Sequence, residues 1–358
     1  MGGAAVCAAS LASKIRRLLV RLVPLSEPHP ELIAPLQRMG LLLPHEAVTF
    51  TPLTGGVSSL IVRVDTPTQS FCLKRALPQL KVAALWEAPV KRNRDEVAWL
   101  RFSAQHLPQA VPALLGEDET DCVFAMAYLP AEQHPVWKQQ LRDGLVDVHT
   151  AEQVAYCLAT WHGASAHNAA LAQTFDHDAD FIAIRLDPYF NATALRHPDC
   201  ANALHGLVQQ TLAHKHVLVH GDVSPKNILV GPHGPVFLDA ECAWYGDPAF
   251  DLAFVLNHLL LKCVWQPAHH LAYLASFDAL SQTYLKAVNW EDPTALEART
   301  CALLAGMLLA RVDGKSPVEY ITQDTQKNLV RRVATNWLVK PPTQLQDIAH
   351  AWAKELHT

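Results

Sequence analysis

Several common signatures are missing from this sequence, and each absence removes a class of protein. There is no long block of basic residues, and the net charge of −5 argues against nucleic acid as a partner. Neither Cys-x-x-Cys nor His-Glu-x-x-His occurs, so no zinc centre and no redox dithiol is predicted. No apolar stretch reaches the roughly 18 residues that a membrane span needs, so no transmembrane segment is expected.

The composition that remains suits one bilobal enzyme or two domains of ordinary size. The chain has 358 residues, and half of them are hydrophobic, which is ample for a core. Eight cysteines are scattered along it, and two of them lie within apolar strands, as expected for buried free thiols. A reducing cytoplasm is therefore the expected location. The oligomeric state is not fixed by any feature of the sequence.

The first 23 residues form an Ala-rich segment in which Lys and Arg alternate with apolar residues. A secretory signal would place its charges before the apolar run, so this pattern instead predicts an amphipathic helix. Three origins stay open: a targeting segment, a helix that lies on a membrane surface, or a wrongly chosen start codon. We expect residues 1–30 to be a poorly ordered extension whose last part, Pro24 to Pro30, is a linker.

The most informative stretch is residues 220–227, which read His-Gly-Asp-Val-Ser-Pro-Lys-Asn. The apolar runs 217–219, 228–230 and 236–238 around it predict short strands, and Gly231 to Gly234 predicts a tight turn. The last two strands then form an antiparallel hairpin. Such a hairpin brings Asp239 back beside Asn227.

These segments supply the groups that phosphoryl transfer to a hydroxyl requires. One carboxylate must orient the hydroxyl and accept its proton, and Asp222 fits because a neighbouring His and Lys keep it ionised. Magnesium prefers a few hard oxygen ligands, which the Asn227 amide and the Asp239 carboxylate offer. The His-x-Asp-x-x-x-x-Asn pattern alone is weak, since Asp222 could be a turn former and Asn227 a strand cap. The hairpin and the second acidic segment favour the active site.

The same residues resemble the catalytic loop and metal segment of the aminoglycoside phosphotransferase and choline-kinase group, which are relatives of protein kinases. Gly221 replaces the Arg of protein kinases, and Asp239-Ala240-Glu241 replaces their Asp-Phe-Gly. The run 244–253, Trp-Tyr-Gly-Asp-Pro-Ala-Phe-Asp-Leu-Ala, is particularly similar to the methylthioribose kinase branch. The resemblance spans about residues 45–320. It implies ATP and Mg²⁺ as cofactors, with Glu241 as a further metal ligand.

The upstream part should bind the nucleotide. Gly55, Gly56 and Ser58 lie in a Gly/Ser turn between two apolar runs, where glycines let the backbone approach phosphate oxygens. This turn is neither a Walker A loop nor the G-x-G-x-x-G of protein kinases. Lys74 ends the strand 70–74, and the resemblance implies that it contacts the nucleotide phosphates.

Residues 91–105 have a helical pattern of apolar positions, and Glu96 is the predicted partner of Lys74 because it lies near that stripe. Glu87 and Asp95 are the competing partners. Two more strands are expected at 111–115 and 122–126. The resemblance places the adenine-binding hinge at the end of the second strand, and the candidate nucleotide contacts there are Met126, Ala127 and Tyr128.

From about residue 150 the pattern is helical, with Thr150 as the cap of the first helix. The resemblance places Asp251 beneath the catalytic loop, and Asp247 is expected to cap the same helix. Methylthioribose kinases bind their sugar with a pair of adjacent arginines in the stretch 293–320. Here only Arg311 occupies that place, next to Ala310, so methylthioribose is doubtful as the substrate. The twin pair Arg331-Arg332 comes later and is an alternative contact or an exposed helix face.

The sequence therefore predicts an α+β, two-lobed protein-kinase-like fold. Residues 31–128 form a small lobe of antiparallel sheet and one helix, and residues 129–358 form a mainly helical lobe that carries the catalytic hairpin. The predicted function is ATP- and Mg²⁺-dependent phosphorylation of a hydroxyl on a small molecule, such as a sugar, amino alcohol or aminoglycoside. The net charge fits an acidic acceptor cleft. Two alternatives are a non-catalytic nucleotide-binding regulator and a kinase that modifies protein side chains.

Overall fold

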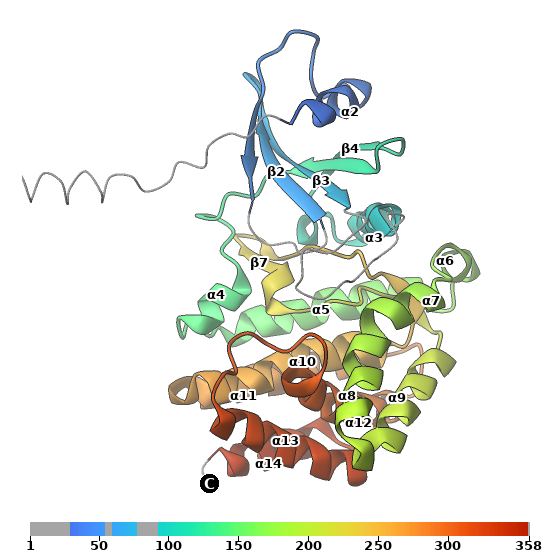
Figure 1. Cartoon of the computed structure of the whole chain (residues 1–358), viewed down its shortest axis with the longest axis vertical. Coiled ribbons are helices and arrows are strands. Elements are labelled where there is room, and N and C mark those ends of the chain that lie inside the picture. The colour runs from blue at the N-terminus through green and yellow to red at the C-terminus, as the bar shows by residue number, and fades with distance from the viewer. Residues whose placement is uncertain (1–28, 54–58, 77–91, 357–358) are drawn as a thin grey trace, which may run out of the picture.

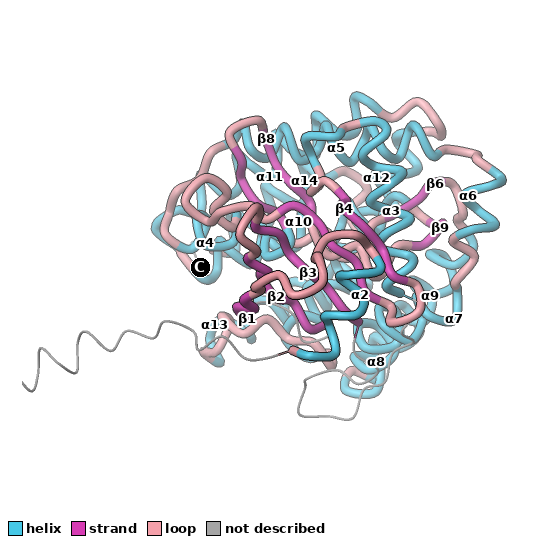
Figure 2. Tube along the Cα trace, turned by 90° about the horizontal axis from the view of Figure 1, so that it is seen from above, coloured by secondary structure: helices cyan, strands magenta, loops and turns pink. Residues whose placement is uncertain are grey.

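The computed structural model describes residues 29–53, 59–76 and 92–356, which form two lobes (Figure 1). The small lobe contains an antiparallel sheet with strand order β1-β2-β3-β5-β4. Its elements are listed here in chain order: η1 (Pro30–Leu32), α2 (Ile33–Arg38), β1 (Thr49–Pro52), β2 (Ser59–Asp65), β3 (Ser70–Ala76), α3 (Arg92–His106), η2 (Pro108–Ala110), β4 (Leu114–Asp118) and β5 (Val123–Ala127). Seen from above, these strands lie over the helices of the large lobe (Figure 2).

The alternation of side chains along β3 divides the small lobe into two faces. Phe71 and Leu73 point into a small core that they share with α2, whereas Cys72 belongs to the large core that continues into the second lobe. Successive residues of a strand face opposite sides of the sheet. Lys74 therefore lies on the same face as Cys72, toward α3 and the large lobe.

The large lobe is mainly helical. Its helices are α4 (Trp137–Arg142), α5 (Val148–Ser165), α6 (Ala169–Thr174), α7 (Asp178–Phe181), the π-helix η3 (Ile182–Asn191), α8 (Ala192–Arg196), η4 (Pro198–Cys200), α9 (Ala201–Ala213), α10 (Pro248–Trp265), η6 (Pro267–His269), α11 (His270–Ala287), α12 (Pro293–Asp313), α13 (Asp324–Val339) and α14 (Leu345–Glu355). The catalytic segment adds β6 (Val217–Val219), η5 (Pro225–Asn227), β7 (Ile228–Gly231), β8 (Gly234–Phe237) and β9 (Trp244–Gly246).

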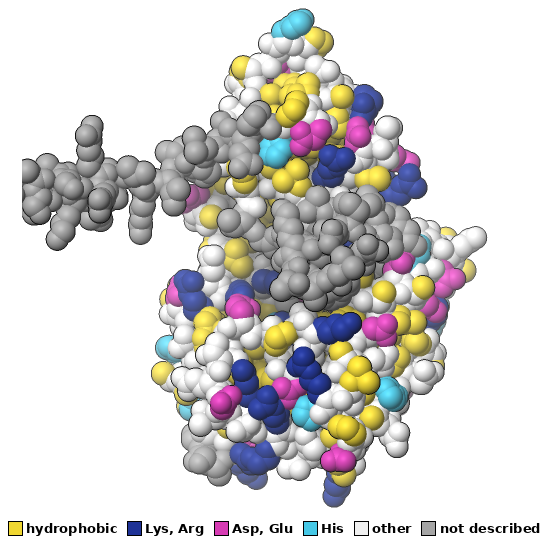
Figure 3. Space-filling model, viewed as in Figure 1, with side chains coloured by type: hydrophobic (Ala, Val, Ile, Leu, Met, Phe, Trp, Pro, Cys, Tyr) yellow, Lys and Arg dark blue, Asp and Glu magenta, His cyan; other side chains and the backbone are white. Residues whose placement is uncertain are grey.

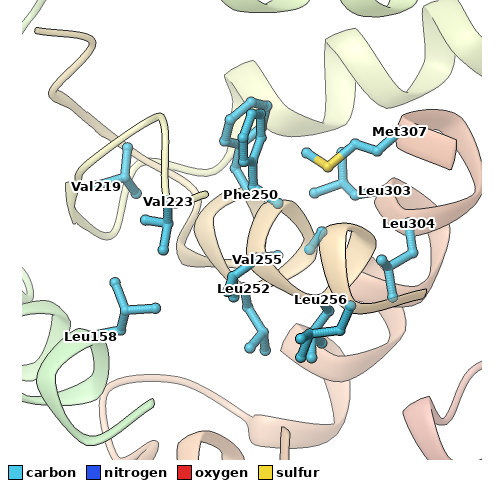
Figure 4. Close-up of a cluster of buried hydrophobic side chains, with 14 of the residues drawn as sticks. Leu158, Val219, Val223, Phe250, Leu252, Val255, Leu256, Leu303, Leu304 and Met307 are labelled. Carbon is cyan, nitrogen blue, oxygen red and sulfur yellow. The ribbon is translucent and has the colours of Figure 1, made fainter. Parts of the chain in front are cut away.

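Helix α10 is the centre of the large lobe. Asp247 caps it by accepting a hydrogen bond from the Ala249 N–H at 3.0 Å, and Pro248 occupies the first turn, as expected. By length and composition α10 is apolar enough to cross a membrane, but 94% of that window is buried inside the protein. Figure 4 shows its apolar side chains packed against α5, the catalytic loop and α12. These contacts are typical of a core helix.

The predicted α+β architecture with two lobes is confirmed, with the five strands and the helix α3 close to their expected positions. One local prediction was wrong. Helix α5 begins earlier than expected, because Asp147 rather than Thr150 caps it by accepting from the His149 N–H. The short helix α2 was not predicted, and it packs on the outer face of the sheet. The expected extension, residues 1–30, lies outside the described residues except for its last two positions.

Candidate active site

The loop after β6 is held in shape by a glycine and a histidine. Gly221 has φ of +77°, and a Cβ on it would lie 2.4 Å from the Cys242 carbonyl oxygen, so no larger residue fits. His220 is buried; its Nε2–H donates to the Leu238 carbonyl at 3.1 Å, and its Nδ1 accepts from the Asp222 N–H at 3.2 Å. Burial lowers the pKa of this histidine, which keeps it neutral. The histidine thereby joins the loop to the β7–β8 hairpin.

Asp251 supports the same loop from below, as the resemblance implied. It is fully buried on α10, and its two carboxylate oxygens accept from the His220 N–H at 2.6 Å and the Gly221 N–H at 2.8 Å. His162 of α5 lies 3.3 Å away through Nε2. A buried carboxylate with several donors is a strong structural contact.

Asp251→Ala is therefore expected to destabilise the protein by about 3 kcal/mol, the size found when one partner of a buried charged network is removed. Two buried backbone N–H groups would lose their acceptor. Urea-induced unfolding measures the change, with Asp199→Ala as the control because Asp199 is exposed. A loss below about 0.5 kcal/mol, the range of surface substitutions, would contradict this role.

Asp222 is a buried residue of this loop and lies between two cations. Its Oδ2 is 3.1 Å from Nη2 of Arg185 and 3.3 Å from Nζ of Lys226. Burial acts to raise the pKa of the carboxyl, but the charges of Lys226 and Arg185 outweigh it and hold the pKa below its ordinary value. Asp222 is therefore ionised at neutral pH and able to accept a proton.

This pairing makes a prediction for the pH dependence of kcat. A base must be ionised, so activity is lost only as the pH falls through the lowered pKa of Asp222, and kcat should be flat between about pH 5 and 8. Lys226→Met removes the strongest charge that lowers this pKa. The acid limb of kcat should then move to higher pH at saturating acceptor. An unchanged limb would show that Asp222 is not the titrating base.

Lys74 lies between the lobes and contacts two carboxylates. Its Nζ donates to Glu96 at 2.9 Å and to Asp239 at 2.5 Å, so the predicted Lys74–Glu96 pair is confirmed. Burial alone would lower the pKa of Lys74, but Asp239 and Glu96 outweigh it and raise the pKa, so the lysine is charged. Of the competing partners, Asp95 instead pairs with His177 at 3.1 Å, and Glu87 lies outside the described residues.

The oxygen donors proposed for a metal lie along the hairpin. The Leu238 N–H donates to the Asn227 carbonyl at 2.9 Å, which places Asn227 beside the residue before Asp239. Nδ2 of Asn227 donates to the Asp222 carbonyl at 3.1 Å, leaving its amide oxygen for another partner. Burial acts to raise the pKa of Asp239, but the charges of Lys74 and Lys226 outweigh it and lower the pKa, so the group is ionised. This donor set of an amide and a carboxylate fits Mg²⁺.

Glu241, the third predicted metal ligand, lies beside an arginine. Its Oε2 lies 3.3 Å from Nε of Arg92, at the start of α3, and its side chain is mostly buried. The ion pair with Arg92 competes with metal coordination, so the role of Glu241 stays a prediction.

Only some of the predicted nucleotide-binding residues belong to the part of the chain that the structure describes. Met126 and Ala127 belong to β5, and the Ala127 N–H already donates to the Ala113 carbonyl at 2.8 Å. Tyr128 follows the strand, and the Cζ atom of Arg63 lies 4.6 Å from the centre of the Tyr128 ring. Three predicted phosphate-loop residues lie outside the described residues: Gly55, Gly56 and Ser58.

Arg185 is a site residue that the sequence did not predict. It is buried in the π-helix η3, where its Nε donates to the Gly221 carbonyl at 2.5 Å and its Nη2 contacts Asp222. No motif marks it, and it lies far from Asp222 along the chain. Irregular helices of this kind are frequent at functional sites.

The predicted substrate residue Arg311 is buried on α12 and is hydrogen-bonded through Nη1 to Tyr189 at 3.1 Å. It lines a hollow that also contains Lys226 of the catalytic loop. The twin arginines that were the alternative contact are both engaged elsewhere: Arg331 pairs with Asp313 at 2.7 Å, and Arg332 pairs with Glu355.

The two lobes and the site between them define a protein of the kinase-like class. Comparison with protein families matches residues 49–284 to the phosphotransferase enzyme family. This match covers more than half of the chain, so the protein belongs to that family. Its members transfer a phosphoryl group to an alcohol group.

Individual relatives agree with this assignment. The chain is similar to methylthioribose kinases of Geobacillus thermodenitrificans, with 26% identity over 262 residues, and Geobacillus kaustophilus, with 28% identity over 274 residues. The alignment with the first relative covers 64% of this chain and 64% of the relative, which is less than two thirds of its length. The alignment with the second covers 67% of both. Among solved structures, amicoumacin kinase in complex with AMP-PNP, Ca²⁺ and Ami superposes with a TM-score of 0.55, covering 90% of this chain and all of that one at 12% identity. That likeness supports the predicted protein-kinase-like fold.

Proposed function

We propose that this protein transfers the γ-phosphoryl group of ATP to a hydroxyl of a small molecule, with Mg²⁺ as the cofactor. The observation that carries the proposal is the ionised Asp222, held between Arg185 and Lys226 on the loop that leads to Asn227 and Asp239. Catalysis of this reaction is mostly positioning and charge neutralisation. The acceptor class we propose is a sugar, an amino alcohol or an aminoglycoside-like compound.

Each bond change and proton transfer in the proposed reaction can be assigned to a group of the site or of the substrates. The acceptor oxygen forms a bond to the γ-phosphorus as the bond from that phosphorus to the β-phosphate oxygen breaks, and ADP leaves. The proton of the hydroxyl passes to Oδ of Asp222. Lys74 holds the phosphates, and Asn227 and Asp239 would hold the metal, which supplies charge neutralisation when bound. The role of Glu241 as a third ligand is part of this proposal.

Two alternatives are weaker. A non-catalytic nucleotide-binding regulator has no need for an ionised carboxylate beside Lys74 and Asn227. A protein kinase would carry Arg at position 221, where only glycine fits, and an Ala-Pro-Glu segment, which the sequence does not contain. The free state of the described cysteines agrees with a cytoplasmic location, which we also propose.

The test is ATP consumption by the purified protein with a panel of sugars, amino alcohols, aminoglycosides and methylthioribose. Turnover that depends on one compound and on Mg²⁺ supports the proposal. Binding of ATP without turnover for any compound would instead favour the regulator. Rapid phosphorylation of methylthioribose would show that Arg311 alone, with Ala310 beside it, suffices for that sugar.

A further inference from the structure

A hollow beside the catalytic loop is lined by an unusual number of cations. It has a volume of about 270 Å³, part of it open to solvent. Its basic residues come from four parts of the large lobe: Lys138 of α4, Lys226 of the catalytic loop, Lys262 of α10 and Arg311 of α12. We call it the cationic pocket. It adjoins the proposed base directly, because Nζ of Lys226 lies 3.3 Å from Oδ2 of Asp222. Lys and Arg side chains also gather on the outer face of this lobe (Figure 3).

The positive charge of the pocket is poorly balanced. Among its described lining residues the one acid is Glu319, whose side chain is 68% exposed and pairs with Lys138. Asp222 is already countered by Lys226 and Arg185. The charges of Lys262 and Arg311 therefore have no acidic partner among the described residues. Buried charges without an ionic partner are destabilising, and such groups are common at functional sites.

Lys262 is the clearest case. It is only 1% exposed, and its Nζ lies over the rings of Tyr320 at 3.8 Å and Trp265 at 4.4 Å, with no described carboxylate in salt-bridge range. Burial and the charges of Lys138 and Arg311 lower its pKa to about 7, although the charge of Glu319 acts in the opposite direction. An aromatic cage holds the amine in place but does not neutralise it.

Unused hydrogen-bonding atoms occur on the same walls. Three buried lining residues have a polar atom without a partner in the described part of the chain: Nε of Arg311, Nε2 of His258 and Oγ of Ser224. Each can donate a hydrogen bond to an oxygen of a bound molecule. Buried polar groups are normally paired, and a ligand with several acceptor oxygens would satisfy these three groups.

We propose that the phosphoryl acceptor carries an anionic group, a phosphate or a carboxylate, that binds in the cationic pocket while its hydroxyl lies at Asp222. This inference rests on the proposed function and narrows it. Amino alcohols and aminoglycosides are cations, which Lys262 and Arg311 would repel. The acidic acceptor cleft that the net charge suggested is not what the structure places beside Asp222. A small hydroxylated acid or sugar phosphate fits the charge of the pocket.

The experiment uses three compounds with one carbon skeleton: ribose, ribonate and ribose 5-phosphate. ATP consumption gives kcat/KM for each, and calorimetry with inorganic phosphate measures the pocket directly. The variant is Lys262→Met, which fills the same space without a charge and should melt at a higher temperature than wild type. Lys286→Met is the control, because Lys286 is exposed on α11. Arg311→Gln serves as a second variant.

We expect ribonate or ribose 5-phosphate to exceed ribose at least tenfold in kcat/KM, and the better of the two identifies the anionic group. Wild type and Lys286→Met should bind phosphate with the same affinity. The affinity of Lys262→Met and of Arg311→Gln for phosphate should be at least tenfold lower. Equal phosphate affinity in wild type and Lys262→Met, or a preference for ribose, overturns the inference. Lys262-dependent phosphate binding, without ATP consumption for these three compounds or for any member of the wider panel, would keep the pocket and reject the proposed function.

Discussion

Asp222→Asn is expected to lower kcat about a thousandfold while leaving the affinity for ATP unchanged. An amide has the shape of a carboxylate but accepts no proton, so the acceptor hydroxyl loses its base. The loop should keep its form, because Arg185 still donates to the carbonyls of Gly221 and Ile184. Initial rates with an accepted compound measure kcat, and calorimetry measures ATP binding.

The matched control is Asp199→Asn, which removes an exposed carboxylate of the same lobe and should leave kcat unchanged. A kcat within tenfold of wild type in Asp222→Asn would place the base elsewhere. A fall in both kcat and ATP affinity would mean that the loop itself has moved. The melting temperature separates that case, since a displaced loop would also lose the hydrogen bonds from His220 and Gly221 to Asp251.

The catalytic hairpin could be predicted because local chemistry determines it. Gly231 and Gly234 bound a turn between two apolar runs, and β7 pairs with β8 in the expected antiparallel register, with Ile228 opposite Phe237. The pairing of Lys74 with Glu96 could also be predicted from the sequence. The alternation of β3 and the 3.6-residue period of α3 place both side chains on facing surfaces.

The charge around Asp222 could not be predicted in the same way. Arg185 reaches the loop from a π-helix that contains Pro188, and neither its backbone form nor its position follows from a periodic pattern. The cationic pocket combines residues from four separate segments of the large lobe. Each lysine alone reads as a solvated surface residue, as most lysines are. Only the packing of α10 shows that Lys262 is buried.

Asp239 is suited to a substitution that separates chemistry from folding. Its backbone has φ of +68°, a left-handed conformation that Asn adopts as readily as Asp. Lys74 contacts both Asp239 and Glu96, so the pair with Glu96 remains when the charge at 239 is removed. Asp239→Asn should therefore fold with a free energy of unfolding within about 1 kcal/mol of wild type. Asp239→Ala should be less stable than Asp239→Asn, because Ala disfavours a left-handed backbone.

Asp239→Asn is expected to reduce kcat/KM about a thousandfold, because a neutral amide replaces the carboxylate proposed to hold Mg²⁺ against the phosphates. Calorimetry of ATP binding with and without Mg²⁺ gives a second readout: the gain in affinity that Mg²⁺ provides to wild type should shrink in the variant. Glu96→Gln should retain that gain, since Glu96 contacts Lys74 rather than the proposed metal donors. A variant at 239 that kept both its Mg²⁺ dependence and its rate would show that the metal is held by other residues, with Glu241 the first to test.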